Sequence, residues 1–435
     1  MRNCWISVSV GLFASCLGWA QQSPGPSAPP PPTITLQDVL QRAKANSVQF
    51  LAAQAESALA KEDRAQARAA LLPNVSYNNQ FLYTQGNRTP SGRFIANNSV
   101  HEYVSQGNAH EVISLEQFAT YRRTSAAEAV ARAKAEIAAR GLVVTAVHDY
   151  YSLVAAQRKF ADADLGATEA LNFLELSKKL EGGGEVAHSD VLKAQLQYND
   201  RSLALRESEL ALLKAKLGLA VLIFPNLNSD FKVADNLNET PALPEFAQVQ
   251  QQASRNNPEL RAAQFNVEAN HQDVIASRAG HLPELALDYF YGIDATHFAV
   301  YTDGVRNLGY AATATLSIPI FSWGATQSKV RQSEIRERQA KVELSATQRD
   351  VLANIQIFYK EAQAAGVELA TLRQSVDLAT ESLRLITLRY QAGESTVLEV
   401  VDAQNTLVTA RVAFADGSAR YRVALADLQT LTGSM

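Results

Sequence analysis

The stretch Leu71-Leu-Pro-Asn-Val-Ser-Tyr-Asn-Asn-Gln-Phe-Leu-Tyr-Thr84 follows almost forty residues of helical, Ala-, Gln- and Arg-rich sequence. After Pro73 its side chains alternate between polar and apolar, and only Asn79 and Leu82 depart from the alternation. The apolar positions are Val75, Tyr77, Phe81 and Tyr83. A period of two with one aromatic face predicts an amphipathic strand. A lone strand cannot cover its own apolar face, so another surface must cover it.

The composition of the whole chain indicates long helices and gives no reason to expect a nucleic-acid partner. Its 435 residues are 47% hydrophobic and 19% charged, and the net charge is -4. Gly and Pro are sparse outside a few segments, which favours helix.

The pattern of the first twenty residues predicts that the protein is exported. Arg2 precedes an apolar run from Trp5 to Leu17, and Gly18-Trp19-Ala20 is a small-x-small cleavage site, so residues 1–20 are expected to be a signal peptide. An alternative is lipidation of Cys16, because Phe13-Ala14-Ser15-Cys16 approximates a lipobox. Both cysteines, Cys4 and Cys16, lie here, so the rest of the chain has no disulfide, thiolate metal ligand or cysteine nucleophile.

Residues 21–32 form a Pro-rich leader, expected to be extended. No later run approaches eighteen apolar residues, so entry into a membrane would have to use strands.

The chain contains two copies of one unit. The stretch Leu282-Pro283-Glu284-Leu285 opens a second alternating segment, and Pro283 lies 210 positions after Pro73. The same offset relates Ala43, Asn46, Ala52 and Ala53 to Ala253, Asn256, Ala262 and Ala263. We therefore predict a first repeat over 33–223, a linker over 224–244 and a second repeat over 245–435.

Each repeat is expected to contain a very long helix. In the second, Leu344, Val351, Phe358, Ala365, Leu372, Ala379 and Ile386 recur every seven residues, and a companion series runs from Ile355 to Tyr390. This is the a/d seam of coiled-coil packing. A helix from Ser322 to Tyr390 would be roughly 100 Å long at 1.5 Å per residue, which suits a tube or a rod.

Each repeat also supplies two strands, expected at about 74–84 and 107–117 in the first and 284–294 and 310–320 in the second. Strands of about ten residues can cross a bilayer when tilted. Four strands cannot close a barrel, because about eight is the practical minimum. An open edge in lipid leaves peptide groups unpaired, so the chain must oligomerise: three copies give twelve strands and four give sixteen. The alternative is a small soluble β cap on a helical rod.

Four elements in this order resemble the TolC-like outer-membrane efflux protein family. They are Asn256–Ala263, Leu282–Leu285, Ile318-Pro-Ile-Phe321 and Tyr390–Gln404. The resemblance covers the chain from about Thr33 and implies a mainly α protein with a membrane β-barrel. It implies a homotrimer with a twelve-stranded barrel in the outer membrane of a Gram-negative-type bacterium and a helical periplasmic tunnel. Its partners would be outer-membrane lipid, a periplasmic adaptor (membrane fusion) protein and an inner-membrane pump of the RND or ABC type. It implies a duct for drug or metal efflux or for type I secretion, with the pump choosing the cargo.

The resemblance also implies a gate at the periplasmic tip. Glu399 and Asp402 match an acidic constriction, and their spacing of three places them on one helix face. Six carboxylates in a trimer would favour cations, and their repulsion is expected to raise some of their pKa values. The alternative is that both are ordinary acids near a helix N-terminus.

Other residues match the family's closing contact and tips. Asp190 and Tyr390 match the closing contact, whereas the basic residue of that network is replaced by Ser395, and Lys193 stands where the second repeat has Asp402. The adaptor-docking tips match Gly184, Glu185, Gly393, Glu394 and Ser395.

The other classes of protein find less support. The sequence has no His-Glu-x-x-His, Gly-x-Ser-x-Gly or phosphate-binding loop, so no enzyme, metal site or cofactor is predicted. The remaining alternative is a periplasmic coiled-coil adaptor or a structural protein of a secretion assembly, which would need further small β domains.

Overall fold

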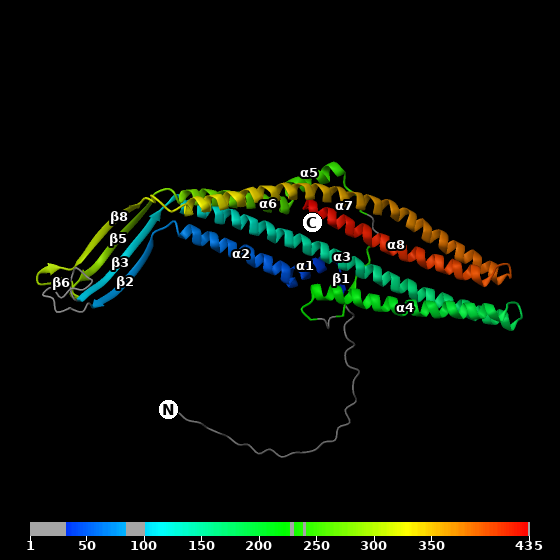
Figure 1. Ribbon diagram of the computed structural model, residues 1–435. Coiled ribbons are helices and arrows are strands. Elements are labelled where there is room, and N and C mark those ends of the chain that lie inside the picture. Colours follow the sequence, from blue (N-terminus) through cyan, green and yellow to red (C-terminus); the bar gives the residue numbers. More distant parts are fainter. Residues whose placement is uncertain (1–31, 84–100, 227–229, 238–240, 434–435) are drawn as a thin grey trace, which may run out of the picture.

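The computed structural model describes residues 32–83, 101–226, 230–237 and 241–433. The predicted signal peptide, Cys16 and the leader up to residue 31 lie outside the described residues. The molecule is long and thin, with a sheet at one end and two helical hairpins at the other (Figure 1).

The helices occur as pairs of almost equal length. Each repeat has a helix of 11 residues, then one of 22, then a very long helix of 68 or 67 residues, and finally one of 36. In the order first repeat and second repeat, they are α1 Leu36–Asn46 and α5 Phe246–Asn256, α2 Val48–Ala69 and α6 Pro258–Ala279, α3 Leu115–Gly182 and α7 Ala325–Gln391, and α4 His188–Ile223 and α8 Val397–Thr432.

Side-chain caps fix where several helices begin. The Thr35 and Thr396 hydroxyls start α1 and α8 in capping boxes with an acid three residues later. Ser47 and Asn257 cap α2 and α6 at equivalent places. A cap satisfies backbone N–H groups that have no partner inside the helix, so these positions are set by local chemistry.

The strands form one antiparallel sheet in the order β2-β3-β5-β8. The strands are β2 Asn74–Tyr83, β3 His101–Ile113, β5 Glu284–Ala295 and β8 Leu308–Ser317. Tyr77, Gly107, Tyr291 and Tyr310 are consecutive partners across the sheet, so the aromatic face is continuous. Many of its side chains are exposed. Within this sheet β2 and β8 are edges.

The helices continue the sheet. In Figure 1, α2, α3, α6 and α7 lie side by side and run on from β2, β3, β5 and β8. Short pairs complete the topology: β1 Thr33–Ile34 with β4 Lys232–Val233, and β6 Tyr301–Thr302 with β7 Val305–Arg306.

The second strand of each repeat differs from its predicted limits. The strand predicted at 107–117 is β3, which runs from 101 to 113 because the Ser114 side chain accepts from the Gln117 N–H and starts α3. The strand predicted at 310–320 ends at Ser317, two residues before Pro319, which has no N–H for a ladder hydrogen bond. The long helix predicted from Ser322 begins at Ala325.

The seam predicted for the second long helix is its buried face. Val351, Ile355, Ala362, Ala365 and Leu369 are buried, and Ala379 and Tyr390 continue the same series. A second core forms where α1, α3, α4 and the β1–β4 pair meet. None of the helices in the described part of the chain is both long and apolar enough to cross a membrane.

Candidate functional site

The two hairpin tips have the same turn. Gly184 follows α3 and Gly393 follows α7, both with φ of 76°. The next N–H in each turn, of Glu185 and of Glu394, donates to a carbonyl five residues back at 2.9 and 2.8 Å. This is the Schellman termination, in which a left-handed residue, usually Gly, closes a helix.

The Glu399 carboxylate is fixed by hydrogen bonds at the N-terminus of α8. It is the third residue of α8 and forms the capping box with Thr396, and the Ser395 hydroxyl donates to its Oε2 at 2.8 Å. Arg389 lies 4.0 Å from the carboxylate. These hydrogen bonds, first from Ser395 and then from Thr396, lower the pKa of Glu399 in the single chain. The predicted raising of the pKa depends on repulsion between chains and stays a prediction.

Asp402 lies one turn further along α8, and both acids are exposed. The corresponding place in the first repeat is different, because Lys193 pairs with Asp190 at 3.5 Å. The two hairpins therefore carry opposite charge at the equivalent positions Lys193 and Asp402, and the excess of acid lies on α8.

Tyr390 joins the hairpins instead of facing the solvent. It is 3% exposed, its hydroxyl lies 3.2 Å from the hydroxyl of Ser177 on α3, and Ser177 is 0% exposed. Its ring packs against Phe173 with centroids 5.1 Å apart. We call Phe173, Ser177 and Tyr390 the tip latch. The predicted contact between Asp190 and Tyr390 is not the one that these side chains make inside the described chain, and it stays a prediction for another state or for a neighbouring chain.

Sequence reasoning missed two members of this region. Ser177 occupies the last place of the apolar series Ala170, Phe173, Leu174, Ser177, at helical spacing, so a hydroxyl in a buried stripe was the available signal. Arg389 supplies a basic group near Glu399 although Ser395 replaces the family's basic residue. Its Nη2 also donates to the Glu394 carbonyl at 3.1 Å.

A second polar cluster connects the hairpins further from the tip. Arg411 on α8 lies 4.0 Å from Asp162 on α3, and Arg201 on α4 donates to Asn405 on α8 at 2.5 Å. Burial raises the pKa of Asp162 and of Glu169 on α3. These contacts cross between the repeats, so they help to set the angle between the two hairpins.

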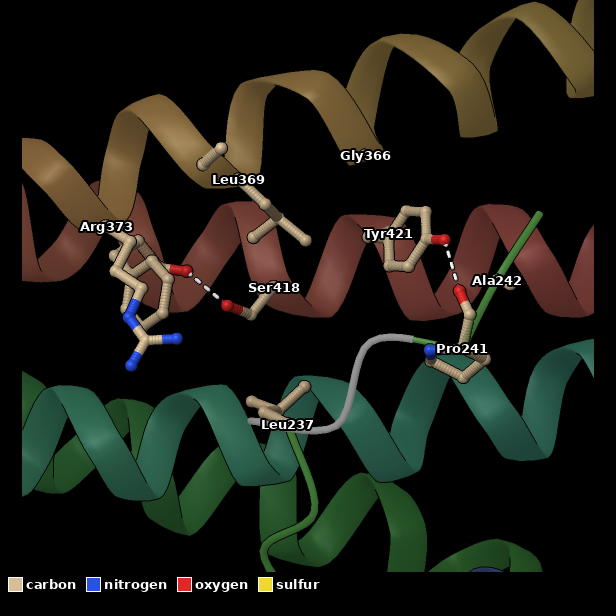
Figure 2. A pocket seen from close by; sticks show the side chains of 10 residues that line it. Leu237, Pro241, Ala242, Gly366, Leu369, Arg373, Ser418 and Tyr421 are labelled. Carbon is tan, nitrogen blue, oxygen red and sulfur yellow. Dashed lines mark hydrogen bonds between the residues drawn. The ribbon is translucent and has the colours of Figure 1, made fainter.

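A cavity lies beside the linker between the repeats. It has a volume of about 760 Å³ and is lined by the linker, α7 and α8 (Figure 2). The Tyr421 hydroxyl donates to the Pro241 carbonyl at 2.5 Å, and a Cβ at Gly366 would lie 3.1 Å from the Tyr421 ring. The absence of a side chain at Gly366 thus lets the Tyr421 ring lie close to α7, while the Tyr421 hydroxyl binds the linker.

Within the described ranges, no group of three or more His, Cys, Asp and Glu side chains could hold a metal ion. What the site offers is a pair of exposed acids on one face, two matched turns and a buried contact between hairpins.

Comparison with known proteins gives relatives along the whole chain. The model of the outer membrane efflux protein family matches residues 249–434. The outer membrane protein TolC of Vibrio cholerae serotype O1 is 24% identical in an alignment of 458 positions, which covers 99% of this chain and 94% of that protein. The alkaline protease secretion protein AprF of Pseudomonas aeruginosa is 24% identical, in an alignment that covers 92% of this chain and 84% of AprF.

A solved structure has the same fold. The outer membrane protein VceC from Vibrio cholerae superposes with a TM-score of 0.79 at 19% identity, covering 92% of this chain and 96% of that one.

Proposed function

Because this chain is a TolC-like outer-membrane efflux protein, we propose that it is the outer-membrane duct of a tripartite efflux or type I secretion system. It conducts substrates passively from an inner-membrane pump, through a periplasmic adaptor, to the outside. The inner-membrane pump selects the cargo.

The observation that carries this proposal is the sheet. It has four strands of membrane-spanning length, a continuous aromatic face and two edges, and it runs directly into helices of up to 68 residues. Lipid would cover the aromatic face, and neighbouring chains would pair with β2 and β8. Three copies supply twelve strands, above the minimum for a closed barrel. The helices, roughly 100 Å long, would cross the periplasm.

The repeats and the tips are assigned on the same basis. We assign one repeat to 33–223, the linker to 224–244 and the second repeat to 245–435. The paired helix lengths and the two identical tip turns support this division. Gly184 and Glu185, with Gly393, Glu394 and Ser395, form the tips that meet the adaptor.

Glu399 and Asp402 are assigned to the gate. Both are exposed on one face of α8 beside the tip, and a trimer would bring six such carboxylates together. Rings of carboxylates favour cations. The tip latch would hold each α7–α8 hairpin against its own α3, which limits the bore.

Planar-bilayer recording tests the duct. We expect a detergent-extracted trimer with small, cation-preferring conductance, and the double variant Glu399→Ala, Asp402→Ala should lose most of that preference. Lys193→Ala is the matched control at the equivalent place of the first repeat. An unchanged ion preference in the double variant would remove both acids from the constriction.

Fractionation separates the duct from the alternative, a periplasmic adaptor. A barrel requires detergent for release, whereas an adaptor leaves with the periplasm when the outer membrane is opened. A monomer that needs no detergent would end the duct proposal.

A further inference from the structure

Trp323 occupies a backbone position that disfavours it. Its φ is 52° and that of Gly324 is 81°, and the Ala325 N–H donates to the Ser322 carbonyl at 3.0 Å. Ser322–Ala325 is therefore a turn with both central residues left-handed, which normally requires Asn, Asp or Gly first. The hairpin of β6 and β7 follows that rule, with Asp303 at 51° and Gly304 at 80°. A Trp in this place is strained.

Burial of the Trp323 side chain does not compensate for this strain. Trp323 is 90% exposed, and its ring makes a T-shaped contact with that of Phe321, with centroids 4.8 Å apart. Phe321 is itself 72% exposed and Ile320 93%. Connecting a strand to a long helix does not require such a turn either. In the first repeat Ile113 passes directly through the Ser114 cap into α3.

The turn lies where the outward face of the sheet ends. Tyr310 and Leu316 of β8 are on that face, and the same alternation carries it on to Ile318 and Ile320. The ten residues of β8, at about 3.3 Å each and tilted about 40°, rise roughly 25 Å, which is the height of the apolar band of an outer-membrane barrel. Residues 318–324 follow at the end that joins α7, on the periplasmic side.

We propose that residues 318–324 are an interfacial anchor, in which Trp323 and Phe321 sit among the phospholipid headgroups of the periplasmic leaflet. This inference rests on the proposed duct, because it needs the aromatic face of the sheet to face lipid. An indole ring suits that depth, since it combines a large apolar surface with one N–H donor. The strained turn holds the two rings out from the helix and fixes the depth at which each chain sits.

Fluorescence tests the anchor directly, because the chain has three tryptophans, Trp5, Trp19 and Trp323. Trp5 precedes both candidate cleavage points, so the exported Trp19→Phe protein has Trp323 alone. In phosphatidylcholine vesicles, lipids brominated at carbons 6 and 7 should quench it more than twice as strongly as lipids brominated at carbons 11 and 12.

The control moves the single tryptophan down α7. Val342 is 67% exposed and lies 19 residues from Trp323, roughly 28 Å along a helix. Val342→Trp in a Trp19→Phe, Trp323→Phe background should not be quenched. Equal quenching of the two proteins, in vesicles that float with conducting trimers, would overturn the anchor alone. Protein that does not float with vesicles would overturn the duct as well.

Trp323→Asn separates anchoring from a structural role. Asn tolerates the left-handed conformation, so thermal stability in detergent should be unchanged or higher, while the rate of insertion into vesicles should fall severalfold. A loss of stability in detergent, or an unchanged insertion rate, would show that Trp323 is not an anchor.

Discussion

Replacing Ser177 by Ala should loosen the tip. The change removes the buried partner of the Tyr390 hydroxyl, and both side chains are at most 3% exposed, so water cannot replace it without local opening. An unsatisfied buried hydroxyl costs about 1–3 kcal/mol. Each 1.4 kcal/mol changes an equilibrium about tenfold, so the hairpins of each chain should separate roughly 5 to 140 times more often.

Removing the other hydroxyl of this pair, in Tyr390→Phe, should destabilise the closed tip less than Ser177→Ala does. In Tyr390→Phe the Ser177 hydroxyl can turn to the carbonyl four residues back in α3, as Ser commonly does in helices. The ring contact with Phe173 is kept. The double variant should then resemble Tyr390→Phe, because no buried hydroxyl is left without a partner.

Hydrogen exchange of the amides at both tips measures the local opening, and single-channel recording measures its effect on conductance. Ser375→Ala is the matched control, since Ser375 is an exposed serine of α7 that bonds only its own helix, to Thr371, in the described structure. The reasoning is wrong if Ser177→Ala exchanges like the control, or if Tyr390→Phe proves the more damaging change.

Two further predictions concern the sheet and the gate. Gly292→Ala should lower the yield of the proposed trimer on a sizing column in detergent, because a Cβ there would lie 2.3 Å from the Ser105 carbonyl oxygen, whereas Gly309→Ala meets nothing within 4 Å and should be tolerated. The pKa of Glu399 is lowered in the folded chain, so its contribution to the start of α8 is complete above its ordinary pKa and is lost as the pH falls through the lowered one. Ser395→Ala should raise the pKa of Glu399 in an NMR titration and make cation preference fade at a higher pH; an unmoved titration would contradict this.

The strands that were predicted well have strong alternation. β2 and β5 lie within one residue of their predicted limits, since their aromatic residues mark one face. β3 was misplaced because Gln106, Gly107 and Asn108 hide the period. Its backbone pairs with β2 on one side and β5 on the other, and this ladder holds it without side-chain patterning.

The candidate site divides in the same way. The local part was visible in sequence, since Thr396 and Glu399 have the spacing of a capping box. The tip latch was not, because Ser177 and Tyr390 are 213 residues apart and meet only through the angle between two hairpins. Such an angle depends on many contacts, among them the one between Asp162 and Arg411.

The two open borders of the sheet have a consequence for biogenesis. In the described part of the chain, the outer sides of β2 and β8 present peptide donors and acceptors with no neighbouring strand in the sheet. Such edges can pair with any extended chain, so, in the proposed oligomer, the interval between export and closure of the barrel carries a risk of aggregation. The yield of the proposed oligomer should therefore depend steeply on how many copies of the chain are present at once.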